Sequence, residues 1–307
     1  MRRLWQAWVE LLDRREAPTA LALVRIGLAL VLLVDQLNVW RLGLVEPLWS
    51  PAPAGFAIGH AVLPGPTLWL ICVLALAAIA LGAATRVACV MFVVASAQLS
   101  LLTPDGESGL DMLARVVFAV LALSRSHARW SLDARIARWL GRPPPPVIPA
   151  WPRYLLMLQL IWVYFSGGHN KASADWGPFG GFTALGNALG DPHAARFDPT
   201  WVGIAYPLTR IATALTMVFE LGAPLYLLAY YYAATAERAG RVRAWFNRLR
   251  VRWIWLGLGV AFQLGIAVGL RLGSFPWGML AIYPVLLSPC DLRVSARRRA
   301  IAPIMDA

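Results

Sequence analysis

The chain contains almost no lysine. Of its 28 basic residues, one is lysine, Lys171, and the others are all arginine. Arginine binds phosphate or directs membrane insertion as well as lysine does, but its guanidinium keeps its proton, whereas a desolvated ammonium can release one. A single lysine in a chain that otherwise uses arginine therefore indicates proton chemistry at Lys171. The alternative is that Lys171 is a chance survivor of arginine-rich coding.

Charge of either sign is scarce as well. Only 14% of the residues are charged, 59% are hydrophobic, and the mean hydropathy is +0.60, which excludes a soluble domain of this length. The sequence predicts an all-α, polytopic membrane protein whose partner is the lipid bilayer. Apolar runs near the ~20 residues that cross a bilayer predict about eight spans. Their approximate ranges are 20–40, 67–84, 86–103, 110–124, 153–168, 208–232, 253–270 and 275–289, and 177–207 could hold a further interfacial segment.

Cysteine and histidine are too few and too scattered for two common kinds of site. The three cysteines show no Cys-x-x-Cys spacing, which argues against a disulfide framework or a thiol redox centre. None of the four histidines stands at metal-ligand spacing from another His, Cys or acid, so we predict no metal site. A nucleotide-binding glycine loop and a Ser/His/Asp arrangement are also missing from the sequence.

The net charge of +12 reports membrane orientation. With the N-terminus placed in the cytoplasm, 21 basic residues fall in predicted inner segments and 5, including Lys171, in outer ones. This asymmetry follows the positive-inside rule and predicts that both termini are cytoplasmic. We therefore predict a multi-pass protein of the bacterial cytoplasmic (inner) membrane that binds no nucleic acid and keeps its first span as an anchor.

The chain divides into three predicted parts. Residues 1–16 form an amphipathic interfacial helix, residues 17–292 form a single transmembrane bundle domain, and residues 293–307 form a basic cytoplasmic tail. A run of four prolines at 143–146 separates two halves of this bundle.

Charges inside apolar spans are candidates for function, because burying them in a membrane is costly. Arg25, Asp111, Arg115 and Glu220 occupy such positions. Asp111 and Arg115 are four residues apart, so they share a helix face and are predicted to form a structural ion pair. A role in locking the bundle is at least as good an explanation as catalysis for Arg25, Asp111 and Arg115, and a weaker one for Glu220.

The segment around Lys171 is the strongest candidate site. His169 lies two residues before the lysine, and Asp175 and Trp176 follow it. Aromatic rings here could line a pocket for a flat hydrophobic ligand, although anchoring at the membrane interface explains most tryptophans in such chains.

These segments, in this order, resemble the horizontally transferred transmembrane domain family, whose best-known member is the vitamin K-dependent γ-glutamyl carboxylase. The resemblance covers roughly residues 19 to 292, and its strongest part, 163–176, resembles the carboxylase segment that bears the catalytic lysine. The other segments that carry it are 21–27, 81–86, 130–133, 219–221 and 273–281.

The resemblance implies a reaction and a set of site residues. Lys171 would be the catalytic base that deprotonates a reduced quinone of the vitamin K or menaquinone type, supported by His169 and Glu220. Tyr164, Asp175 and Trp176 would bind the cofactor, and a secreted peptide on the outer side would be the substrate.

The chain also departs from the carboxylase. A large extra-membrane domain that captures the substrate propeptide is missing, Leu110 stands where the family has a histidine, and Phe262-Gln263 stands where a span histidine is usual. The sequence thus leaves three functions open. One is a quinone-dependent carboxylase-like or oxygenase-like lyase, the second is a non-enzymatic partner for maturation or export of a secreted peptide, and the third is a small-solute carrier built around Arg115 and Glu220.

Overall fold

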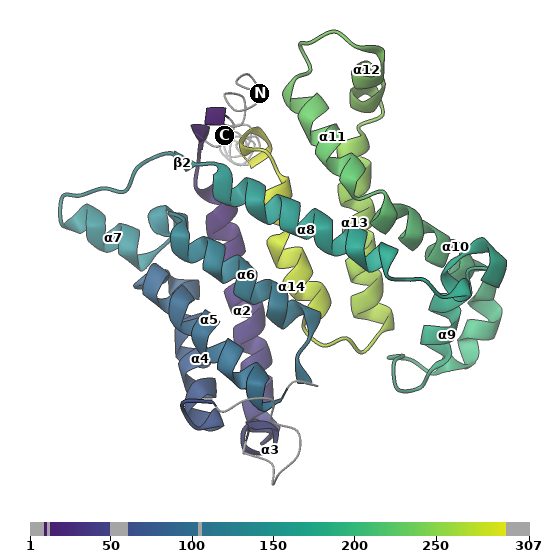
Figure 1. Ribbon diagram of the computed structural model, residues 1–307, viewed down its shortest axis with the longest axis horizontal. Coiled ribbons are helices and arrows are strands. Elements are labelled where there is room, and N and C mark those ends of the chain that lie inside the picture. Colours follow the sequence, from purple (N-terminus) through teal and green to yellow (C-terminus); the bar gives the residue numbers. More distant parts are fainter. Residues whose placement is uncertain (1–8, 11–12, 50–60, 104–105, 293–307) are drawn as a thin grey trace, which may run out of the picture. The chain divides into compact units, whose positions relative to one another are not determined.

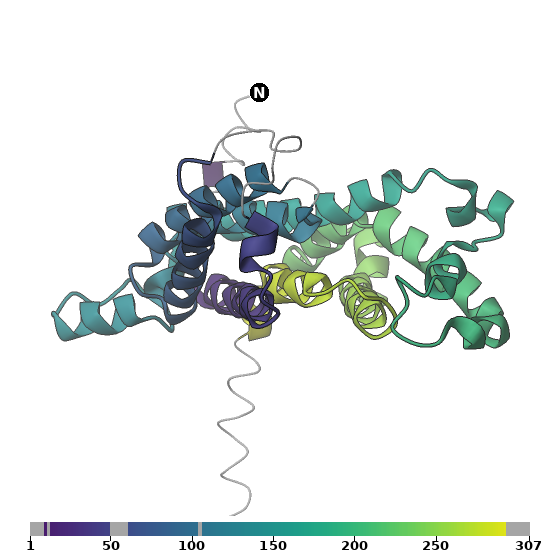
Figure 2. The same ribbon diagram turned by 90° about the horizontal axis from the view of Figure 1, so that it is seen from below.

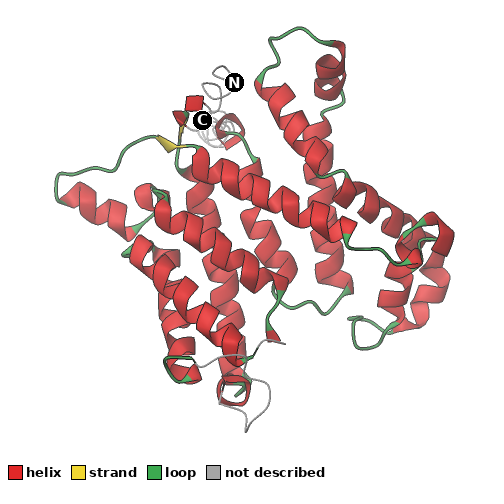
Figure 3. Ribbon diagram, viewed as in Figure 1, coloured by secondary structure: helices red, strands yellow, loops and turns green. Residues whose placement is uncertain are grey.

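The structure is a computed structural model that describes residues 9–10, 13–49, 61–103 and 106–292. Helices dominate this part of the chain, as Figure 3 shows, and the predicted all-α class is confirmed. Most of the helix expected over residues 1–16 and all of the tail at 293–307 lie outside the described residues. The last two residues of the former, Arg15–Glu16, form a short strand, β1, that pairs antiparallel with β2 (Ile148–Pro149).

The chain separates into two compact units. The first unit comprises Met1–Met157 and Ala281–Ala307, and the second comprises Leu158–Leu280. Helix α8 (Trp151–His169) and helix α14 (Phe275–Ile282) each cross from one unit to the other along the chain.

Four apolar helices form the body of the first unit. They are α2 (Thr19–Arg41), α4 (Gly65–Leu81), α5 (Thr85–Leu102) and α6 (Gly109–Leu123). Helix α4 packs between α2 and α5, and α6 packs on α5 and also touches α2, so the four enclose a common core. Figure 2 views this bundle roughly along α2. Leu28, Leu76 and Phe118 are completely buried in it, and their close van der Waals packing stabilises the unit.

Shorter elements complete the first unit. Helix α3 (Val45–Trp49) follows α2, and η2 (Ser126–Ala128) and α7 (Leu132–Trp139) follow α6. The 3₁₀ helix η6 (Tyr283–Leu286) packs against α2.

Arg25 is a structural residue of this bundle. Its guanidinium is fully buried and donates to the carbonyls of Ile79 and Ala80, which end α4, and to the Trp130 carbonyl at 2.6 Å. Gly82 permits this approach, because a Cβ there would lie 2.7 Å from the Arg25 Nη1. Arg25 thus satisfies carbonyls that a helix C-terminus leaves open, and these hydrogen bonds join α2 to the end of α4.

Asp133, on α7, is hydrogen-bonded to the start of α5. Its carboxylate accepts hydrogen bonds from the Ala84 and Thr85 backbone N–H groups and from the Thr85 hydroxyl. Burial raises the pKa of Asp133, but these hydrogen bonds together outweigh burial and hold the pKa below its ordinary value of 3.8.

Arg153 and Glu16 form a buried ion pair in the first unit. The Arg153 Nε lies 2.7 and 2.9 Å from the two carboxylate oxygens, and Nη1 donates to the Val285 carbonyl at 3.1 Å. Only 1% of the Arg153 side chain is exposed. Burial raises the pKa of Glu16, and the hydrogen bond and charge of Arg153 counteract that rise.

The second unit consists of the end of α8 and a group of helices around α10. These are α9 (Ala184–Gly190), α10 (Val202–Leu221), α11 (Pro224–Ala234), α12 (Arg241–Arg248) and α13 (Val251–Gly269). Helix α9 packs on α10, α13 contacts α10 and α11, and α12 folds back on α11. Three 3₁₀ turns, η3 (Ala174–Trp176), η4 (Pro178–Gly180) and η5 (Pro199–Trp201), lie between α8 and α10.

Helices occur at every predicted span, but two spans differ from the prediction. The last, expected over 275–289, consists of α14 followed by the 3₁₀ helix η6. The single span expected over 208–232 is divided into α10 and α11 by Gly222-Ala223, and Pro224 then begins the new helix. Proline at this position suits a first helical turn and cannot continue the hydrogen bonding of α10, which explains the break. In the described residues, Thr19–Arg41, Thr85–Leu102, Pro199–Leu221 and Val251–Gly269 are long and apolar enough to cross a membrane. The segment 177–207 contains α9.

Candidate functional site

Lys171 lies in the second unit, just beyond the end of α8. The backbone turns sharply there, since the Asn170 N–H still donates to Ser166 and the Lys171 N–H donates to the Gly168 carbonyl. This turn carries the only lysine of the chain to the last turn of α10.

At that point the Lys171 ammonium forms a hydrogen-bonded ion pair with Glu220. The Glu220 side chain is 6% exposed and the Lys171 side chain is 22% exposed, so the carboxylate is buried and the amine remains partly accessible. Leaving either charge buried without the other would cost several kcal/mol, which holds the two together. The sequence placed both residues among the candidates, and the structure brings them into contact.

Aromatic rings surround the ammonium. Lys171 Nζ lies 4.5 Å from the centroid of Trp176 and 6.0 Å from that of Phe262. Such cation–π contacts each stabilise a cation by about 0.5–1 kcal/mol at accessible sites. Trp176, which was predicted to bind a cofactor, is thus placed beside the amine.

One of two adjacent glycines of α8 allows the close approach to Glu220. A Cβ at Gly168 would lie 2.8 Å from the Glu220 Cβ and 3.2 Å from the Leu221 nitrogen, which is closer than side chains tolerate. At Gly167 a Cβ would lie 3.7 Å from the Glu220 Oε1, an ordinary contact distance. Gly168 is therefore the residue whose small size lets α8 meet α10 at the ion pair.

A cluster of aromatic side chains underlies the pair. Tyr164, Phe219 and Trp255 pack edge to face or tilted with ring centroids between 4.7 and 5.7 Å apart, and Phe262 joins Phe219 at 5.5 Å. The Gln263 amide, fully buried in α13, donates to the Tyr164 hydroxyl at 2.7 Å. These contacts fix the helices that carry Lys171 and Glu220.

An apolar cavity of about 430 Å³ adjoins this cluster. Phe219 and Phe262 belong to its wall, and the remaining lining comes mainly from apolar side chains of α9, α10 and α13. Ligand pockets in proteins have volumes of ~300–1,000 Å³, so the cavity is large enough for a bicyclic ring. Phe262 links it to the ion pair, because the same ring faces the Lys171 ammonium.

The other predicted site residues have different partners in the structure. The His169 ring stacks on Phe165 at 6.2 Å, and Asp175 accepts a hydrogen bond from Thr183. Tyr164 lies buried in the aromatic cluster. Tyr164, Asp175 and Trp176, the predicted cofactor-binding residues, are not among the residues that line the 430 Å³ cavity.

Sequence reasoning did not select the cavity residues or Gln263 as site residues. Gln263 was noted only as a departure from a family histidine, yet an amide in the middle of an apolar span is itself a signal of a buried polar interaction. Phe219 and Phe262 carried no such signal, because an apolar side chain in an apolar helix looks the same whether it faces lipid or a cavity.

The Asp111–Arg115 ion pair expected from their spacing is not present in the structure. Asp111 instead closes a capping box at the start of α6, where its carboxylate accepts from the Ser108 N–H at 2.9 Å and from the Ser108 hydroxyl at 2.8 Å. Arg115 pairs with Glu107. The first turn of a helix offers an acid several unpaired N–H groups, and Asp111 bonds there in preference to the arginine one turn away.

Long apolar helices, a sparsely charged composition and an ion pair set at the ends of two helices define a multi-pass membrane protein. The particular family follows from comparison: the HTTM domain matches residues 13–290. The chain belongs to the HTTM domain family, as its resemblance to the membrane domain of the carboxylase indicated. No solved structure matches it.

Proposed function

We propose that this protein is a membrane enzyme in which Lys171 acts as a general base in the quinone-dependent modification of a secreted peptide. One observation supports this more than any other: the only lysine of the chain pairs with the buried Glu220 beside an apolar cavity. An arginine would make the same pair but could not give up its proton.

The ion pair provides a route for that proton. Lys171 Nζ can accept a proton from a substrate only after it has released one of its own, and the Glu220 carboxylate is hydrogen-bonded to it as the immediate acceptor. Because Glu220 is shielded from water, transfer to it leaves two neutral groups, and a neutral pair is less costly in a buried site than two separated charges.

The cavity fits a reduced quinone in size and polarity. Leu258, Phe219 and Phe262 would hold the ring system, and Phe262 would bring it next to the amine. When bound, a reduced quinone would supply acidic hydroxyls and ring electrons that react with oxygen, chemistry that no side chain of this site offers. The protein would contribute the base, its proton acceptor and the exclusion of water.

The distribution of basic residues indicates on which side of the membrane the substrate would meet the site. Lys171 falls in a predicted outer segment, so a peptide that has crossed the bacterial cytoplasmic membrane would meet the site. The lyase activity, the quinone and the secreted peptide all belong to this proposal.

The test is binding and oxygen-dependent conversion of reduced menaquinone or a reduced vitamin K analogue by the purified full chain. We expect the wild type to bind the quinone and form its epoxide, and Lys171→Arg to bind it but lose at least about 100-fold in turnover. Leu215→Trp, which fills the cavity, should abolish binding. Leu225→Trp, at an exposed position on α11, is the matched control and should bind normally.

Two results would overturn the proposal. Full turnover in Lys171→Arg would show that Lys171 is not the base. Absence of quinone binding to the wild type would show that a quinone is not the cofactor. In the second case the non-enzymatic peptide partner becomes the leading function, and co-purification of a secreted peptide with the chain would support it.

A further inference from the structure

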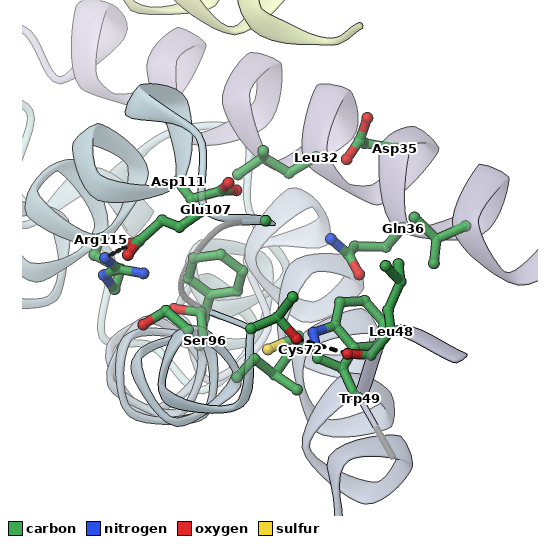
Figure 4. A pocket seen from close by; sticks show the side chains of 16 residues that line it. Leu32, Asp35, Gln36, Leu48, Trp49, Cys72, Ser96, Glu107, Asp111 and Arg115 are labelled. Atoms are coloured by element: carbon green, nitrogen blue, oxygen red, sulfur yellow. Dashed lines mark hydrogen bonds and ion pairs between the residues drawn. The ribbon is translucent and has the colours of Figure 1, made fainter. Parts of the chain in front are cut away.

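The first unit contains a second, polar pocket that the proposed reaction does not use. It has a volume of about 180 Å³ and lies where α2, α3, α5 and the start of α6 converge (Figure 4). A single water needs only ~10–15 Å³, so the pocket can hold a small molecule. Gln36, Ser96, Ser100, Glu107, Asp111 and Arg115 supply most of its polar lining.

The hydroxyl groups in this pocket act as hydrogen-bond acceptors. Ser96 and Ser100 each donate their proton to a carbonyl one turn back in α5, those of Val93 and Ala97, and Thr103 donates to the Leu48 carbonyl at 2.6 Å. A hydroxyl has one proton and two lone pairs, so these groups have only acceptor capacity left.

Gln36 adds an acceptor without a partner. Its Oε1 atom is buried and receives no hydrogen bond in the structure. Figure 4 shows the Gln36 amide extending from α2 into the pocket. A buried carbonyl oxygen without a hydrogen-bond donor costs about 1–3 kcal/mol, and a ligand that carries a donor would remove that cost.

The charges of the pocket also favour a cationic ligand. Glu107 and Arg115 neutralise each other, and the other charged residues of the lining are two acids, Asp35 and Asp111. Asp111 uses one oxygen in the capping box, which leaves its other oxygen and its negative charge uncompensated by a cation among the described residues. The described residues contain no group of three His, Cys, Asp or Glu side chains that could hold a metal ion, so the acceptors point to an organic cation.

We propose that this pocket binds a primary ammonium group of ethanolamine size. Three N–H donors on such a group match the Gln36 carbonyl, the Asp111 carboxylate and the serine hydroxyls, and the charge complements Asp111. The ammonium can come from a free amine or from the headgroup of phosphatidylethanolamine, which share this chemistry.

Calorimetric titration of the full chain in phosphatidylcholine nanodiscs with ethanolamine tests the proposal. Choline is the comparison probe, because it carries the same charge without N–H donors. We expect ethanolamine to bind at least about tenfold more tightly than choline. Equal binding of the two would show recognition by charge or by aromatic rings, and would overturn the proposal.

Substitutions at Gln36 separate recognition from folding. Gln36→Met keeps the length of the side chain and removes its carbonyl, so ethanolamine binding should fall by at least about tenfold. Gln36→Lys places a tethered ammonium in the pocket and should abolish binding while raising the melting temperature of the ligand-free protein. Gln98→Met is the control, since Gln98 bonds to the Val62 N–H and does not line the pocket. Unchanged binding in Gln36→Met, or a lowered melting temperature in Gln36→Lys, would contradict the assignment.

A second experiment, with lipids, identifies the source of the ammonium. Native mass spectrometry of protein taken from nanodiscs with equal phosphatidylethanolamine and phosphatidylcholine should show retained phosphatidylethanolamine if the lipid is the ligand, and this retention should be lost in Gln36→Met. Binding of free ethanolamine without lipid retention would identify a soluble amine. If neither is bound, the proposal is wrong, whatever the outcome at Lys171.

Discussion

Each unit contains a buried ion pair with a glutamate, and the two pairs use different cations. In the first unit Arg153 holds Glu16 through two bonds from one nitrogen and also bonds to the Val285 carbonyl, with 1% of its side chain exposed. In the second unit Lys171 bonds to Glu220, lies over Trp176 and keeps 22% of its side chain exposed.

The difference indicates two kinds of role. The planar, multiply bonded guanidinium of Arg153 is suited to joining segments of chain, and its proton is permanently held. Among the described residues, the ammonium of Lys171 donates one hydrogen bond to protein, to Glu220, so it has donors left for a ligand. A chain that uses arginine almost everywhere keeps lysine at the pair that Phe262 links to the cavity.

The largest effect on stability is expected from Arg153→Lys. The ammonium keeps the charge opposite Glu16, but its single nitrogen cannot take the places of both Nε and Nη1. A hydrogen bond lost by a buried charged group costs about 1.5–3 kcal/mol in unfolding free energy. Denaturant titration of the purified protein measures this. Arg138→Lys, at an exposed position on α7, is the control and should change stability by less than about 0.5 kcal/mol. If Arg153→Lys hardly changes the free energy of unfolding, the two ion pairs do not differ in the way described here.

The converse change, Lys171→Arg, should leave stability nearly intact. Guanidinium preserves the charge opposite Glu220, so we expect a change below about 1 kcal/mol in the same titration. The loss should appear in turnover alone. If Lys171→Arg destabilises the protein as much as Arg153→Lys does, the lysine is a structural residue like the arginine.

Gly168→Ala should disturb the second pair through packing. Its Cβ would meet the Glu220 Cβ at 2.8 Å and push α8 from α10, at a cost of about 1–3 kcal/mol and with reduced turnover. Gly167→Ala is the matched control, because its Cβ meets Glu220 at 3.7 Å. It should be neutral or slightly stabilising in the helix. Equal effects of the two alanines would show that helix propensity matters here and close approach does not.

The smallest effect concerns Asp133, a carboxylate of the first unit held by hydrogen bonds from the start of α5. Asp133→Asn should lower stability by about 1 kcal/mol at neutral pH, as loss of a helix cap does. Because the pKa of Asp133 is depressed on folding, the advantage of the wild type is present above pH 3.8 and is lost as the pH falls below that value. Melting curves of both proteins in mildly acidic and strongly acidic buffer measure it. Glu237→Gln, at an exposed site, should show no such convergence.

The sequence predicted the helices well, because long apolar runs have few alternatives in a bilayer. It predicted Lys171 and Glu220 as site residues from the cost of buried charge and from resemblance, and the structure shows them in contact. It failed at Asp111 and Arg115, where helical spacing competed with the unpaired N–H groups of a helix start. It also could not locate the cavity, because the faces of an apolar helix that meet lipid, protein or empty space have the same composition.

The Arg153–Glu16 pair has a consequence for the synthesis of the protein. Translation makes Glu16 first, Arg153 137 residues later and the Val285 carbonyl a further 132 residues on, yet the three meet around one guanidinium. The Arg153–Glu16 pair can therefore form first, and the third bond completes the junction only after η6 has been made. Until then the Arg153 guanidinium lacks the Val285 carbonyl as an acceptor.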